Sequence, residues 1–344
     1  MKYCGGCDTT KNETEFHKDS LTRYGLQSRS RCKECDAAAA KARAKTLEGA
    51  LEMLAHHAQQ RAKSGRVERC EIDKNDLRQI YDTQRGLCFY SGLPMNHDKR
   101  GWKISLERLD QAGNYVLENI ALIVLELNNW QQWTLEKVKL VVLNYLSGDT
   151  TPIFADFSLP TERKKVNKSV KEIRNGEIFY RCTKFCNDFH PASNFTKQVR
   201  DGCEECRKRI NEEGLNTPRG HFMKLLNNAR RHTQKRNANP KRTPTVCELT
   251  LEDLVAKFNA QGGRCAISRM PLKFGPKKDW AASLERRDVN IGYTPANTSL
   301  IANLFQATDP SSIMNDDPDD NTSYGWTREK FLVFVESARK KLGL

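Results

Sequence analysis

Hydrophobic and polar positions predict a strand–loop–strand–helix unit in the middle of the chain. Apolar residues recur between Ile104 and Leu109, which suggests one strand, and residues 119–124 form an apolar run that predicts a second. The segment between them, residues 110–114, has the composition of a turn. Residues 125–132 can begin a helix. The same order of elements returns from Trp280 onward.

Two other stretches carry helical patterns. Residues 37–66 are rich in alanine and other helix formers. Residues 207–242 hold eleven Lys or Arg against two Glu, with apolar residues at helical spacing opposite a basic face. Such a face is often only solvated, but here we expect phosphate contacts. The expected nucleic-acid-binding residues are Arg230, Arg231, Lys235 and Arg236.

The chain also repeats itself. CFYSGLPM at 88–95, WKISLERLD at 102–110 and NYVLENIALIVLELN at 114–128 are followed by CAISRMPL at 265–272, WAASLERRD at 280–288 and GYTPANTSLIANLFQ at 292–306. Each copy closes with a predicted helix, at Trp133 and at Trp326, and an acidic insertion at 315–321 delays the second. Because the blocks recur in order at near-constant spacing, we interpret the chain as a tandem duplication.

The repeat predicts three parts: a first module at 1–148, a linker at 149–178 and a second module at 179–344. The linker is charged and contains prolines without clear periodicity, and residues 161–174 can form a short helix.

Composition narrows the class of partner. The 344 residues are enough for two domains, and a net charge of +14 favours a polyanion, although charge alone does not separate DNA, RNA and anionic membrane. No apolar run reaches the roughly 18 residues of a membrane span, and the N-terminus has no apolar signal-peptide core. We therefore expect no membrane partner and an intracellular, reducing compartment. The 12 cysteines there are metal ligands or core thiols rather than disulfides.

Each copy begins with two closely spaced pairs of cysteines. They are Cys4, Cys7, Cys32 and Cys35 in the first copy, and Cys182, Cys186, Cys203 and Cys206 in the second. Short loops of this kind place two thiolates at the reach that a tetrahedral Zn²⁺ requires, so we expect two closed, structural zinc sites. Free thiols or redox pairs are the alternative. His17 and His190 lie inside the loops and can replace a ligand, but four cysteines suffice and surface histidines are expected.

Four single cysteines stand outside these pairs: Cys70, Cys88, Cys247 and Cys265. We interpret them as small buried apolar residues. A second metal site at Cys70 and Cys88 would need two more ligands, which the sequence does not indicate.

The predicted strand–loop–strand unit can bring two hard metal ligands together. Glu107 on the first strand and Asn128 at the helix start can point to one place, and their oxygens suit Mg²⁺. A Mg²⁺ ion there could polarise a phosphodiester and stabilise its leaving oxygen. Arg108 could clamp the phosphate with its planar guanidinium. The alternative is a Glu107–Arg108 ion pair on a strand face.

At these residues the chain resembles a known family. The run S-L-E-R-x-D, then G/N-Y-x-x-x-N, then N nine residues later resembles the HNH, or His-Me finger (ββα-metal), nucleases. The C-x-x-S-G-x-P stretch is similar to HNH proteins of phages and large DNA viruses. The combination of this core with zinc knuckles of four cysteines resembles zinc-containing HNH restriction enzymes of the PacI type. The resemblance covers roughly 4–147 and 182–341 and implies an α+β fold of two tandem zinc-knuckle plus ββα-metal modules joined by a linker.

The resemblance also implies roles for single residues of the first copy. Glu107 matches the acidic metal ligand, Asn128 the closing metal ligand and Asn119 the residue that pins the loop. Arg108 stands where many members carry the histidine general base, and Arg is a poor base because it stays protonated. Tyr90, water activated directly by the metal and His97 are the alternatives, and Tyr90 can equally be a packed aromatic residue.

The second copy keeps part of this set. It retains Glu285, Arg286, Asp288 and Asn297. Gln306 replaces the closing Asn, and Ile267 stands where Tyr90 would be. We expect Glu285 and Gln306 to hold the second catalytic metal and this site to be the weaker one.

Two functions remain open at this point. The first is a Mg²⁺- or Mn²⁺-dependent endonuclease that acts on double-stranded DNA as a monomer and internal pseudo-dimer, homing- or restriction-like. The second is a catalytically degenerate HNH-type zinc protein that binds nucleic acid without cutting. The retained Glu, Arg and Asn of the first copy favour cleavage, and the missing histidine favours binding alone.

Overall fold

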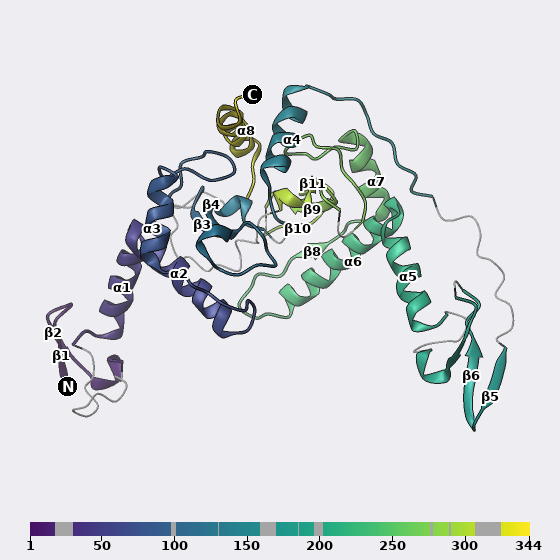
Figure 1. Cartoon of the computed structure of the whole chain (residues 1–344), viewed down its shortest axis with the longest axis horizontal. Coiled ribbons are helices and arrows are strands. Elements are labelled where there is room, and N and C mark those ends of the chain that lie inside the picture. The colour runs from purple at the N-terminus through teal and green to yellow at the C-terminus, as the bar shows by residue number, and fades with distance from the viewer. Residues whose placement is uncertain are drawn as a thin grey trace. The chain divides into compact units, whose positions relative to one another are not determined.

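The chain is a mixed α+β protein in a computed structural model (Figure 1). The structure describes residues 1–17, 30–97, 101–129, 131–158, 170–184, 186–195, 202–275, 278–288, 290–306 and 325–344. The helices are α1 (Lys33–Ala44), α2 (Leu47–Lys63), α3 (Lys74–Thr83), α4 (Leu135–Leu146), α5 (Glu204–Leu215), α6 (Pro218–Asn237), α7 (Leu251–Ala260) and α8 (Arg328–Leu342). The strands are β1 (Lys2–Cys4), β2 (Thr9–Lys11), β3 (Ile104–Arg108), β4 (Ile120–Val124), β5 (Lys171–Arg174), β6 (Glu177–Arg181), β7 (Phe189–Pro191), β8 (Val246–Cys247), β9 (Ala282–Arg286), β10 (Gly292–Tyr293) and β11 (Thr298–Ala302).

Two compact units make up the fold. The first unit contains Met1–Val142 together with the C-terminal segment that holds α8, and the second contains Leu143–Gln306. Each unit has its own region of paired cysteines, its own helix pair and its own antiparallel hairpin. None of the described helices combines the length and the apolarity that a bilayer crossing requires.

The hairpin of the first unit pairs β3 with β4, and Glu107 lies opposite Ala121. All five residues of β4 are buried, because this strand is apolar throughout and packs between neighbours on both faces. In the second unit β9 pairs with β11 in the same way, with Glu285 opposite Ser299. Helix α3 contacts β4, and its counterpart α7 contacts β11.

Equivalent glutamines attach these helices to their hairpins. The side-chain nitrogen of Gln84 donates to the carbonyl of Leu122 at 2.8 Å, and its oxygen accepts from the same residue's amide at 3.0 Å. Gln261 makes the same two hydrogen bonds to Leu300, at 2.8 and 3.0 Å. The duplicated sequence therefore produces duplicated contacts.

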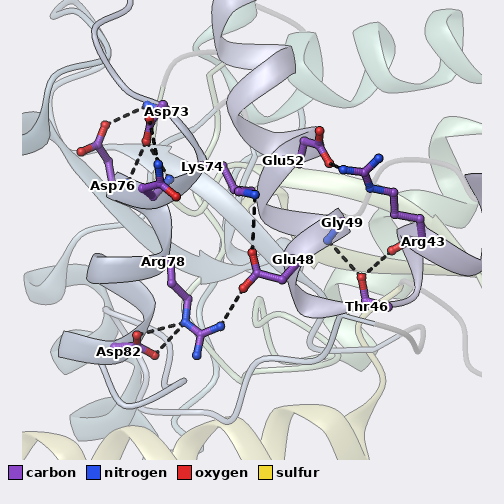
Figure 2. Close-up of polar contacts among 11 residues, drawn as sticks. Arg43, Thr46, Glu48, Gly49, Glu52, Asp73, Lys74, Asp76, Arg78 and Asp82 are labelled. Atoms are coloured by element: carbon purple, nitrogen blue, oxygen red, sulfur yellow. Dashed lines mark hydrogen bonds and ion pairs between the residues drawn. The ribbon is translucent and has the colours of Figure 1, made fainter.

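The stretch at 37–66 forms two helices rather than one. Thr46 begins α2: its hydroxyl accepts from the Gly49 amide at 3.1 Å and donates to the Arg43 carbonyl at 2.7 Å (Figure 2). A Cβ at Gly49 would lie 2.0 Å from that carbonyl oxygen, so only glycine lets the helices approach this closely. Thr217 and Gly220 make the same break between α5 and α6.

The segment at 125–132 does not begin a helix either. It contains a short 3-10 turn at Leu125–Leu127, and α4 starts only at Leu135. The predicted short helix at 161–174 falls mostly outside the described residues, and its last part, Lys171–Arg174, is strand β5. The acidic insertion at 315–321 also lies outside the described residues.

Packing joins parts of the chain that the sequence repeat separates. Helix α8 belongs to the second copy, yet it packs in the first unit, where the Lys330 ammonium lies 3.0 Å from the Glu126 carboxylate. Residues 149–158 were predicted to be linker, yet they lie on the second unit, where Asp149 pairs with Arg264 at 2.7 Å. The predicted boundaries at 148 and 179 follow the repeat, whereas the compact units divide within α4, after Val142, and the first unit also contains α8.

Candidate metal centres and nucleic-acid interface

The first cysteine group is assembled from a hairpin and a helix start. Cys4 ends β1 and Cys7 lies in the turn after it, while Cys32 caps α1 and Cys35 lies in its first turn. Their four Sγ atoms all lie within 4.8 Å of one another. The predicted grouping of the four cysteines is confirmed, and thiolates at that spacing can hold one structural Zn²⁺.

Backbone amides point at this group. The Cys32 amide donates to Cys4 Sγ at 3.1 Å, and the Gly6 amide donates to it at 3.4 Å. The hydrogen bond from Cys32, above all, lowers the pKa of the Cys4 thiol to about 6. A thiolate is the form that binds metal, so the backbone prepares this cysteine for a cation. Phe16 is buried against the group.

The second group has the same plan. Cys182 follows β6, Cys186 lies in the next turn, Cys203 caps α5 and Cys206 lies in its first turn. Their Sγ atoms also lie within 4.8 Å of one another, and the Cys203 amide donates to Cys182 Sγ at 3.3 Å. This group too can hold one structural Zn²⁺.

The two histidines of the knuckles differ. His190 is half-buried, and its Nε2 lies 3.2 Å from Cys186 Sγ, so it is a neighbour of the metal group. His17 is exposed, as expected. Of the single cysteines, Cys88 and Cys265 are fully buried, and within the described residues all four stand outside both groups of potential ligands.

Glu107 occupies an unusual position for a carboxylate. It lies on β3 with 4% of its surface exposed, and burial raises its pKa to about 7. The side chain of Gln132 hydrogen-bonds to this carboxyl group and partly offsets the rise. Oε1 of Glu107 has no hydrogen-bond partner among the described residues. A buried, unpartnered carboxylate oxygen is costly unless a cation or another donor meets it.

Asn128 lies over the same strand. Its Nδ2 donates to the Ser105 hydroxyl at 2.8 Å and to the Leu106 carbonyl at 3.0 Å. Ser105 and Glu107 share one face of β3, because side chains alternate along a strand. The structure therefore places Asn128 and Glu107 over the same face.

Arg108 points away from this face. Its Nη1 donates to the Gly113 carbonyl at 2.6 Å, and its guanidinium lies 5.0 Å from the centre of the Tyr115 ring. The alternative of a Glu107–Arg108 ion pair is absent from the described contacts. The guanidinium supports the loop through Gly113, and its charge lowers the pKa of Glu107 against the larger effect of burial. The phosphate clamp stays a prediction.

Asn119 holds the loop between the strands. Its Oδ1 accepts from the Asp110 amide at 2.7 Å, and its Nδ2 donates to the carbonyls of Asp110 and Asn114 at 3.0 and 2.9 Å. Asn297 makes the matching contacts with Asp288 and Gly292. Both asparagines therefore act on the loop backbone.

The candidates for the general base are poorly placed for that role. Tyr90 is only 3% exposed, and burial together with the nearby Glu107 raises its pKa. A phenol with a raised pKa stays protonated at neutral pH, so it is poorly suited to accept a proton from water. Tyr90 also packs edge-on against Phe89, with ring centres 5.4 Å apart. His97 is half-buried in the segment before β3.

Sequence reasoning missed Gln132. Its Nε2 donates to the carbonyls of Arg108 and Leu109 at 2.7 Å each, at the end of β3. Its side chain also hydrogen-bonds to Glu107 and Tyr90. No motif marks this residue, because it reaches the carboxylate only after the chain folds back over the hairpin.

The hairpin of the second unit differs at two points. Gln306 donates from Nε2 to the Leu284 carbonyl at 3.1 Å, while its Oε1 accepts from the Ser283 hydroxyl. Glu285 is half-buried rather than buried. Arg286 lies over the Tyr293 ring at 4.8 Å, as Arg108 does over Tyr115. Ile267 is buried at the position of Tyr90.

Of the four basic residues expected on α6, three are available to a ligand. Arg230, Arg231 and Lys235 are exposed. Arg236 is half-buried, and its Nε donates to the Thr243 carbonyl at 2.9 Å, so it is partly used within the fold.

Comparison of the chain with protein-family models, with curated proteins and with solved structures gives no match.

Proposed function

We propose that the chain is a divalent-metal-dependent DNA endonuclease built from two HNH-type modules on zinc knuckles. The observation that carries this proposal is the buried Glu107 carboxylate, whose Oε1 is unpartnered and which shares a strand face with Asn128. The net charge of +14 and the exposed cations of α6 fit a nucleic-acid substrate.

The donor set of the first hairpin fits a hard cation. Burial raises the pKa of Glu107 to about 7, and a neighbouring positive charge would restore its ionised form. Asn128 contacts β3 through its nitrogen, so its amide oxygen is not used by the strand. Glu107 and Asn128 would hold Mg²⁺ or Mn²⁺, which when bound polarises a phosphodiester oxygen.

The surrounding residues keep this pair in position. Gln132 ties the carboxyl group of Glu107 to the last carbonyls of β3. Asn119 fixes the loop that joins the strands, and Arg108 supports it through the Gly113 carbonyl. Rotamers fixed in this way are what a metal site needs from its surroundings.

A second candidate function is nucleic-acid binding without cleavage. Tyr90 has a raised pKa and Arg108 stays protonated, so neither is suited to take a proton from water. Gln306 uses its amide oxygen on Ser283, which favours an inactive second hairpin.

Plasmid cleavage tests the choice. Supercoiled DNA is incubated with the protein and Mg²⁺, Mn²⁺ or EDTA. Nicked or linear product with metal, none with EDTA, and its loss in Glu107→Ala support the endonuclease. Glu118→Ala is the matched control, because Glu118 is an exposed carboxylate in the same hairpin. DNA binding without cleavage under any metal would favour the second function.

A further inference from the structure

A groove opens in the second unit between α5, α6 and residues 156–158. Its volume is about 1030 Å³. Ile210 and Leu215 of α5 give it apolar walls, and α6 from Pro218 to Arg231 forms the opposite side. All the lining residues belong to the second unit, so the groove exists within one compact body.

One face of α6 lines this groove. Met223, Asn227 and Arg231 follow one another at intervals of four residues, and Lys224 and Asn228, also four apart, lie beside them, so the five residues lie on the same side of the helix. Lys224 and Asn228 are half-buried, while Asn227 and Arg231 are exposed. The face thus combines two cations with two amides, each able to donate and accept hydrogen bonds.

The corresponding face of the first unit lacks the two cations. Aligned on the Thr46 and Thr217 breaks, α2 carries Met53 and Gln60 where α6 carries Lys224 and Arg231. Glu48 and Glu52 of α2 align with Arg219 and Met223. Both glutamates are engaged in ion pairs (Figure 2). Glu52 lies 2.6 Å from Arg43, and Glu48 lies 2.7 Å from Arg78. Among the described residues, therefore, the second unit has a basic face with two amides at this place and the first unit does not.

We propose that this groove holds one strand of nucleic acid, with phosphates on Lys224 and Arg231 and base edges on Asn227 and Asn228. Cations neutralise phosphates, and asparagine amides match the donor–acceptor edges of bases. The groove has the volume of a small-ligand site, which takes a few nucleotides of one strand rather than a double helix. The assignment rests on the proposed function, since the ligand is nucleic acid.

The groove also separates the basic residues of α6 into two groups. Lys235 follows Arg231 by four residues and extends the groove face toward the helix end. Arg236 points elsewhere, to the Thr243 carbonyl. We therefore assign a strand-binding role to Arg231 and Lys235 and a structural role to Arg236.

Binding of a labelled single-stranded oligonucleotide, followed by fluorescence anisotropy at several salt concentrations, tests the proposal. Lys224→Gln/Arg231→Gln should weaken binding and reduce the slope of log affinity against log salt by about 1.4, since each single-strand phosphate contact contributes about 0.7. Asn227→Ala/Asn228→Ala should weaken binding by about tenfold and leave the slope unchanged. Arg209→Gln is the matched control, because Arg209 is an exposed arginine of α5 outside the groove lining.

The outcomes separate this proposal from the proposed function. Wild-type affinity and slope in both groove variants, with zinc content and circular dichroism unchanged, would overturn the groove assignment and leave endonuclease activity standing. Failure of the wild-type protein to bind any single-stranded or duplex DNA would overturn both. A loss in the groove variants that Arg209→Gln does not share supports the groove.

Discussion

Asn128 and Gln306 occupy equivalent places after their hairpins but use their amides differently. Asn128 donates from its nitrogen to both the Ser105 hydroxyl and the Leu106 carbonyl. Gln306 donates to the Leu284 carbonyl but accepts from the Ser283 hydroxyl through its oxygen. A strand residue therefore hydrogen-bonds to the amide oxygen of Gln306, whereas β3 contacts Asn128 through its nitrogen. The first hairpin is thus better able to offer an amide oxygen to a cation.

This difference predicts unequal sites. Glu107→Ala should remove most nicking of supercoiled plasmid, whereas Glu285→Ala should mainly suppress linear product, because the weaker site makes the second cut. Both variants should retain two Zn²⁺ per chain and wild-type circular dichroism, since neither residue lies near a cysteine group. Glu107→Ala that cuts as fast as wild type would refute the assignment, and an inactive Glu285→Ala would reverse the asymmetry.

Exchanging the two amides tests the same relationship more directly. Gln306→Asn shortens the side chain by one methylene and should let its nitrogen serve both strand groups, as in Asn128. Linear product should then form faster, on the order of tenfold if one ligand oxygen is gained. Asn128→Gln should slow nicking by a similar factor. Unchanged rates in both variants would mean that these amides only brace the strands.

Local pattern was enough to predict the hairpins and the cysteine groups. An apolar run such as Ile120–Val124 is buried on both faces and has few alternatives to a strand. The spacing of Cys4 and Cys7, with a second pair at a helix start, defines four thiols within reach of one ion. Both predictions, of the strands and of the cysteine groups, could be made because the residues that determine them are close together in the sequence.

Other features depend on tertiary contacts that no short segment encodes. Residues 149–158 have no periodicity of their own, and the ion pair between Asp149 and Arg264 attaches them to the second unit. The same Trp-Thr pair precedes α8 and α4, so the sequence of α8 does not say which unit it joins. Gln132 likewise approaches Glu107 only through the folded chain.

The zinc groups should dominate the stability of the knuckles. Cys32→Ser should lower the zinc content from two ions to one per chain and unfold the first knuckle, because structural zinc contributes folding free energy directly. Cys70→Ser, outside both groups, should keep both ions. Metal analysis and limited proteolysis would measure this. Zinc-free protein purified without chelators would contradict it.

The ion pair between Glu126 and Lys330 should hold α8 in the first unit. The Glu126 side chain is 1% exposed and that of Lys330 17%, so breaking the pair leaves a buried charge. Lys330→Met should therefore destabilise the unit by about 3 kcal/mol. Lys340→Met is the control, because Lys340 is a largely exposed lysine on the same helix.

A double substitution separates packing from charge at this contact. Leu304 stands in the second unit where Glu126 stands in the first. Glu126→Leu/Lys330→Met should recover most of the lost free energy of unfolding, since it removes both charges. Urea denaturation would measure each variant, and equal losses in the single and double variants would show that packing alone matters.

The second unit should lose stability in acid through His221. This histidine is buried; its Nε2 donates to the Ala282 carbonyl at 2.7 Å and its Nδ1 accepts from the Gly275 amide at 3.2 Å. Burial and the nearby Lys224 lower its pKa from the ordinary 6.5, while the hydrogen bond to Ala282 opposes them. The folded state therefore holds the neutral ring, with Nδ1 unprotonated.

The sign of the pH effect follows from that lowered pKa. Above pH 6.5 the ring is neutral in both states, so its full contribution is present. As the pH falls from 6.5 toward the lower folded value, only the unfolded chain takes up the proton, and stability falls by up to about 1.4 kcal/mol per pH unit. Protonating Nδ1 in the fold would also set a donor against the Gly275 amide.

His221→Gln should cost about 1–3 kcal/mol of the free energy of unfolding at neutral pH through its lost hydrogen bonds. The gap between wild type and variant should then narrow on acidification, as measured by urea unfolding across this range. A constant gap would show that His221 acts only through packing.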